Sequence, residues 1–127
     1  MGTVFSDSGK AWVTSVINGG TRGSAADMKY VAWGTGAGTS GTSDTNLFTE
    51  ASETRVVGNQ SRITTTATND TFQVVGTLTA NGTKTITNAG LFDASTNGNM
   101  LIKGDFTGVT LLTNDQIQFT FTLQAWQ

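Results

Sequence analysis

The chain of 127 residues contains no histidine, no cysteine and no proline. Imidazole and thiolate groups carry out most nucleophilic, general-base and transition-metal chemistry in proteins. Catalysis by this chain would therefore depend on carboxylates alone. We expect the chain not to be an enzyme and to use no cofactor. The lack of cysteine does not indicate a cellular compartment, because a chain without thiols folds equally well under oxidising and reducing conditions.

Charge is also scarce, since charged residues make up only 13% of the chain and the net charge is −2. The seven basic residues are scattered, without a run or a stripe. A phosphate-binding surface needs clustered lysine and arginine, so we expect no nucleic-acid partner. No run of 18 apolar residues occurs, and residues 1–7 lack the pattern of a signal peptide. We therefore expect no membrane partner and synthesis in a cytoplasm.

Threonine is abundant instead, with 25 residues, and 16 glycines accompany it. Threonine is β-branched and fits a pleated, half-exposed surface. The length suits one domain, and residues 28–127 are predicted to form a single β domain. Residues 1–27 have a different pattern. They are predicted to form either an opening strand of that domain or an N-terminal arm that becomes ordered against a partner.

The clearest strand covers residues 116–125, where five apolar residues alternate with five polar ones. This period of two places one dry and one wet face on a strand. About seven strands are predicted, over residues 28–34, 53–57, 62–68, 72–79, 84–92, 100–106 and 116–125. With turn signals between them, they indicate an all-β fold, an antiparallel sandwich or barrel that is jelly-roll-like. Periodicity alone does not choose between sandwich and barrel.

Turn chemistry supplies the connections between these strands. Three pairs predict hairpin turns: Gly58-Asn59, Asn81-Gly82 and Asn97-Gly98. Residues 34–43 are rich in glycine, serine and threonine and predict a flexible loop. Asp44 is predicted to cap one helical turn within residues 44–51.

Two patterns could carry chemistry, and both have simpler interpretations. Residues 36–41 match the G-x-G-x-x-G spacing of dinucleotide sites, but such a site needs a βαβ unit that the antiparallel pattern does not provide. Glu50 and Glu53, or Asp93 and Asp105, could form a glycosidase-like carboxylate pair. Most of the nine acidic residues, however, lie at turns or strand ends, where capping explains them. No calcium-loop pattern occurs, so we place no metal ion.

The candidate residues for a partner interface lie near the two ends of the chain: Trp12, Val13, Val16, Ile17 and Trp126. An aromatic residue near a loose end gains most from burial against a partner. Trp33 lies within a predicted strand and is expected in the core or at a subunit contact. The polar face of residues 116–124 is uncharged, and an uncovered edge of this kind invites pairing with another chain.

Two stretches of the chain support a comparison with a known class of proteins. The first runs from Tyr30-Val31-Ala32-Trp33-Gly34 through the glycine-rich loop to residues 44–50 and Arg55-Val56. The second contains Ala89-Gly90-Leu91-Phe92, its sharpest part, and continues through Met100-Leu101-Ile102 to residues 115–123. This order, over residues 28–125, resembles small structural proteins of tailed-phage virions.

The resemblance implies either a decoration (cement) protein of the capsid or a part of the tail fibre or baseplate. We expect a capsid decoration protein: a homotrimer, made in the host cytoplasm, that binds the outside of the shell. It would stabilise the capsid surface by bridging subunits of the major capsid protein, with the N-terminal segment as the docking element. The alternatives are a tail-fibre or baseplate module that recognises host glycan, and a carbohydrate-binding module.

Overall fold

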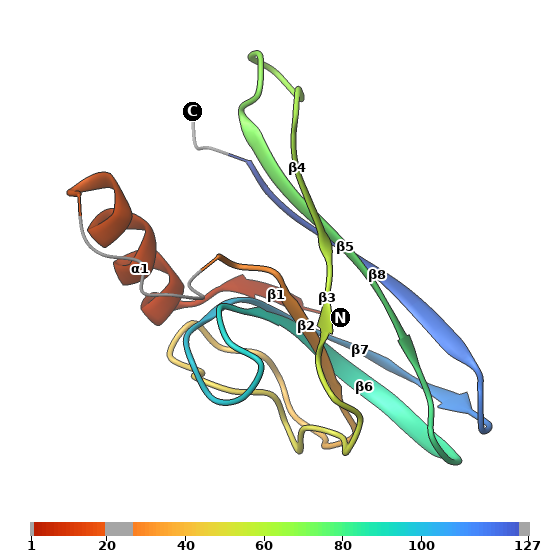
Figure 1. The fold of residues 1–127 in the computed structure, drawn as a ribbon. Coiled ribbons are helices and arrows are strands. Elements are labelled where there is room, and N and C mark those ends of the chain that lie inside the picture. Colours follow the sequence, from red (N-terminus) through yellow and green to blue (C-terminus); the bar gives the residue numbers. More distant parts are fainter. Residues whose placement is uncertain (1, 20–26, 125–127) are drawn as a thin grey trace.

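A computed structural model describes residues 2–19 and 27–124. These residues form two antiparallel β-sheets and one helix (Figure 1). The prediction of an all-β, antiparallel fold is confirmed, and the two separate sheets that share one core make it a sandwich. The described ranges contain eight strands, where about seven were predicted.

The larger sheet, here called sheet A, has the strand order β1-β7-β6-β2-β3. Its members are β1 (Gly2–Phe5), β2 (Tyr30–Gly34), β3 (Val56–Val57), β6 (Lys84–Phe92) and β7 (Met100–Leu111). The smaller sheet, sheet B, has the order β4-β5-β8. It consists of β4 (Asn59–Ile63), β5 (Thr71–Thr79) and β8 (Gln116–Gln124). Strand β8 shows the predicted alternation, with Phe121 buried and its polar neighbours exposed.

The chain passes between the two sheets where two of the three hairpins were predicted. Gly58 connects β3 of sheet A to β4 of sheet B, and Asn81-Gly82 connects β5 of sheet B to β6 of sheet A. These two hairpin predictions are wrong, because turn chemistry specifies a reversal of the chain and not the strand with which the next one pairs. The third is confirmed: Asn97 and Gly98 have φ angles of 54° and 75°, and they lie between the paired strands β6 and β7.

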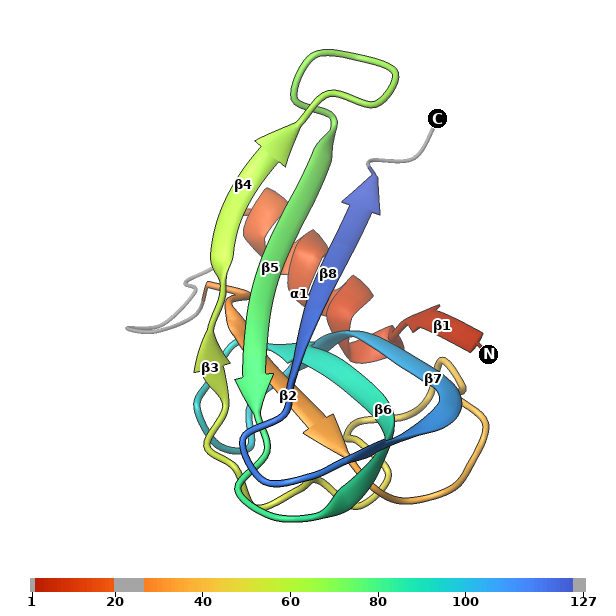
Figure 2. The same ribbon diagram turned by 90° about the vertical axis from the view of Figure 1, so that its right-hand side faces the viewer.

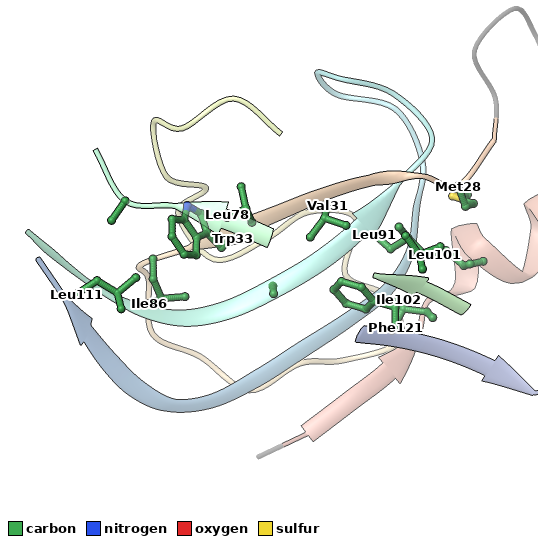
Figure 3. Close-up of a cluster of buried hydrophobic side chains, with 13 residues drawn as sticks. Met28, Val31, Trp33, Leu78, Ile86, Leu91, Leu101, Ile102, Leu111 and Phe121 are labelled. Carbon is green, nitrogen blue, oxygen red and sulfur yellow. The ribbon is translucent and has the colours of Figure 1, made fainter. Parts of the chain in front are cut away.

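Side chains from both sheets fill the main core (Figure 3). Trp33 of β2 is only 1% exposed and meets the ring of Phe119 on β8 edge-on, with the ring centroids 6.3 Å apart. The expectation that Trp33 lies in the core is therefore confirmed. A second, smaller cluster lies on the other face of sheet A, where Leu47 packs with Ala32, Phe92 and Met100.

The helix α1 (Asp7–Ile17) was not predicted from the sequence. It begins after Ser6, whose Oγ accepts a hydrogen bond from the amide of Gly9 at 3.0 Å, and it ends at Asn18, followed by Gly19 with a φ of 82°. Both ends follow the ordinary capping rules. At Gly9 a Cβ atom would lie 2.8 Å from the Cα of Leu101. Only glycine therefore lets this end of the helix approach β7 so closely.

Residues 35–50 form an irregular loop, and the predicted helical turn after Asp44 is absent. The carboxylate of Asp44 accepts hydrogen bonds from the amide of Gly41 and from the ammonium of Lys103, each at 2.9 Å. The backbone of Phe48 exchanges two hydrogen bonds with the side chain of Asn88. The helical prediction fails because Asp44 serves as the partner of a buried lysine and not as a helix cap.

Candidate functional site

The N-terminal candidate residues all lie on α1, which sits behind sheet B in Figure 2. Trp12 and Val13 are half-buried and pack against the main core. Val16 is half-buried, and Ile17 is 72% exposed. Trp126, the fifth candidate, lies outside the described residues. The structure thus places two of the five residues against the domain itself and leaves Ile17 available for contact.

An apolar groove of about 230 Å³ separates α1 from sheet B. Trp12 and Val13 line it from the helix, while Phe72 and Leu123 line it from β5 and β8. Met28 and Leu101 are also in its lining, together with Asp27 and Gln60. The groove can accept an apolar side chain, because most of its wall is hydrocarbon.

A polar hollow of about 400 Å³ lies between residues 46–55 and residues 95–97. Arg55, whose side chain is 2% exposed, is one of its lining residues. The guanidinium donates two hydrogen bonds of 2.9 Å to Glu50 and further ones to the carbonyls of Ala94 and Asn97. It also lies 3.7 Å from the centroid of the Phe92 ring. Arg55 therefore joins two loops that are distant in the sequence.

Glu53 anchors the neighbouring corner of the sandwich. Its carboxylate accepts hydrogen bonds from the indole of Trp33 at 3.0 Å, from the amide of Asn81 at 2.9 Å and from the ammonium of Lys84. Burial favours the neutral acid, but the hydrogen bonds from Lys84, Asn81 and Trp33 outweigh it and lower the pKa of Glu53 to about 2. Glu50 and Glu53, the candidate carboxylate pair, are thus bound to different cations.

The low pKa of Glu53 predicts a specific loss of stability in acid. Because the pKa is about 2 when folded and 4.5 ordinarily, Glu53 stabilises the fold fully above about pH 5, and the contribution disappears as the pH falls toward 2. We expect the wild-type chain to lose about 3 kcal/mol more than Glu53→Gln between pH 6 and pH 2. Urea denaturation of both proteins over this range measures the difference. Parallel curves for the two proteins would refute the assignment.

The other candidate acids also have structural partners. Asp93 accepts hydrogen bonds from the amide of Asn99 at 2.8 Å and from its side chain at 3.0 Å, which closes the loop between β6 and β7. Asp105 accepts one from the amide of Ser40 at 3.0 Å. This bond fastens the glycine-rich loop to β7. Hydrogen bonding from Ser40 lowers the pKa of Asp105. The loop predicted to be flexible is therefore attached to β7 through Ser40.

Neither a membrane-crossing helix nor a metal cluster is found within residues 2–19 and 27–124. The one helix there is too short and too polar to span a bilayer. In the same ranges, no group of three or more acidic side chains gathers where it could hold a metal ion.

The comparison with known protein families gives the decisive match. The family model described as podophage GP4 fiber I protein gp80 matches residues 5–125. The chain belongs to this phage fibre family. Its resemblance to structural proteins of tailed phages is thereby confirmed, and as a fibre protein it is a component of the virion. No curated protein and no solved structure matches it.

Two parts of this fibre protein were missed by the sequence analysis. The helix carried a readable signal, because Ser6-Asp7 and Asn18-Gly19 are typical start and stop pairs. The hydrogen bonds that Arg55 makes had no readable signal in the sequence. Its partners come from residues 50, 94 and 97, and only the folded chain brings these together.

Proposed function

We propose that this fibre protein is a structural module of a phage tail fibre that acts by shape and contact, without catalysis. The observation that carries the proposal is the family match over residues 5–125. The structure supports it, because the candidate catalytic acids are engaged in ion pairs and loop caps. The surfaces that remain for partners are the apolar groove beside α1 and the exposed strand margins of the two sheets.

Host-glycan recognition is not part of this proposal. Sugar-binding sites commonly offer an aromatic ring on which the sugar stacks, with polar groups around it. The lining of the polar hollow, as described, contains no aromatic residue. Trp33 is buried in the core, and Trp12 faces the groove beside α1. A contact role toward other virion proteins fits these surfaces better.

Capsid decoration, with the major capsid protein as partner, is the competing assignment, and location on the particle separates the two. We expect gold-labelled antibodies against the purified chain to mark the tails of intact phage particles in electron micrographs. Particles that lack this gene product serve as the control and should stay unlabelled. Label spread over the heads, with bare tails, would overturn the fibre assignment in favour of decoration.

A further inference from the structure

The four edge strands of the sandwich differ sharply in how they are protected. Proteins blunt exposed edges with short strands, charged side chains or proline. Within the described residues, β1 has four residues, β3 has two, and β4 has five with an exposed Arg62. Strand β8 has nine residues and carries no charge. It is therefore the longest of these four edge strands, and no charged side chain protects it.

Strand β8 pairs with β5 along its whole length and has no described strand on its other side (Figure 2). Its outward side chains Gln116, Gln118, Thr120 and Thr122 are exposed. Its far row of backbone amides and carbonyls thus has the arrangement that another antiparallel strand could complete.

An apolar hollow of about 260 Å³ opens beside the same edge, between β8 and the β1 side of sheet A. Its wall includes Ile102, Phe106, Phe119 and Phe121. The three phenylalanine rings follow one another, with centroids 6.1 Å apart between Phe106 and Phe119 and 6.3 Å apart between Phe119 and Phe121. A partner that pairs with β8 would also cover this aromatic row.

The order of residues in β8 suits a second copy of the same strand as the partner. The strand reads Gln-Ile-Gln-Phe-Thr-Phe-Thr-Leu-Gln, which is nearly the same in both directions about Thr120. An antiparallel copy centred there places like against like: Gln116 on Gln124, Ile117 on Leu123, Gln118 on Thr122 and Phe119 on Phe121. A twofold interface requires this kind of self-complementarity, because one surface meets itself.

We propose that β8 pairs antiparallel with β8 of a second copy of this chain, about a twofold axis at Thr120. The two B sheets then form one six-stranded sheet, with the inner faces of both copies on the same side. Phe119 of each copy lies opposite Phe121 of the other, and aromatic cross-strand pairs of this kind stabilise sheets. The proposal concerns assembly and does not depend on the fibre assignment.

The mass of the purified chain in solution is the first test. We expect light scattering after size-exclusion chromatography to give twice the 13.3 kDa of one chain. A stable mass of one copy would overturn the proposal. So would three copies, the homotrimer that the phage resemblance implied, or an open series of larger species.

Single cysteines test the register, and the absence of native cysteine makes the result unambiguous. In the proposed pairing, residue 120 lies directly opposite residue 120 of the second copy. We expect Thr120→Cys to give a covalent dimer on a non-reducing gel after mild oxidation, because facing cysteines on paired strands are within disulfide reach.

Thr122→Cys is the matched control, since Thr122 is exposed on the same face of the same strand. Its counterpart in the second copy lies four residues further along, about 13 Å away, and disulfides do not bridge that distance. This variant should remain uncrosslinked. Crosslinking of both variants, or of neither, would contradict the register.

Charge at the axis provides an independent readout of the interface. Thr120→Lys places two like charges opposite each other only in the dimer, so we expect its mass to fall to one copy. Thr77→Lys, exposed on the central strand β5, should keep the mass of two. Mixing Thr120→Lys with Thr120→Glu should restore pairs. A Thr120→Lys protein that remains dimeric, or a mixture that remains monomeric, would overturn the proposal.

Discussion

Replacing Asp44 by alanine is expected to lower the free energy of unfolding by about 3–5 kcal/mol, because it leaves a charge buried without its partner. The ammonium of Lys103 is completely buried, with the carboxylate of Asp44 at 2.9 Å and the centroid of the Phe48 ring at 3.3 Å. The hydrogen bonds from Gly41 and Lys103 lower the pKa of Asp44 and keep it ionised. Chemical denaturation monitored by circular dichroism measures the loss.

A double variant separates the lost ion pair from general damage to the loop. Lys103→Met keeps an unbranched apolar stem in the buried space and removes the charge. When it is combined with Asp44→Ala, neither charge is left without a partner, and replacement of a buried ion pair by apolar groups is often neutral. We expect the double variant to be more stable than Asp44→Ala alone. Equal or lower stability of the double variant would show that the buried charge is not the cause.

Replacing Trp33 by alanine is expected to cost about 3–5 kcal/mol, as for other large aromatic residues in cores. Its ring joins the sheets through the contact with Phe119, and its indole donates to Glu53. The substitution therefore leaves a cavity at the centre of the sandwich and takes one donor from a buried carboxylate. The midpoint and the slope of urea denaturation measure the loss.

Trp12→Ala is the matched control for this prediction, because it removes the same side chain from the wall of the groove beside α1. Trp12 is only half-buried, so less surface returns to water and no closed cavity forms. We expect a clearly smaller loss of stability than for Trp33→Ala. Equal losses would mean that Trp33 does not have a special role in joining the two sheets.

The strands were predictable where one face is apolar and buried and the other is polar and exposed, because the sequence then alternates with a period of two. Phe72, Val74 and Leu78 of β5 alternate toward the core, as the apolar spacing indicated. The final strand was recovered nearly residue for residue. Strand β4 was placed too late in the chain, over residues 62–68, because four of its five residues are exposed and polar and give no periodic signal.

What the sequence could not show depends on residues that meet only after folding. Gly58 carries the chain from one sheet to the other, and at that position a Cβ atom would lie 2.5 Å from a methyl group of Val74. Nothing local distinguishes this passage from a hairpin turn. The ion pair of Lys103 with Asp44 spans 59 positions of the chain, so no local pattern in the sequence indicated it.

Arg62 on β4 has a consequence for the size of the assembly. Strand β4 is the other edge strand of sheet B, opposite β8. Two copies joined through β8 would therefore have β4, with its Arg62 guanidinium, as the outer strand at each end of the six-stranded sheet. A third copy that approached either outer strand would meet a short strand with an exposed positive charge, which disfavours further strand pairing. The proposed pairing through β8 would therefore give a closed dimer and not a filament.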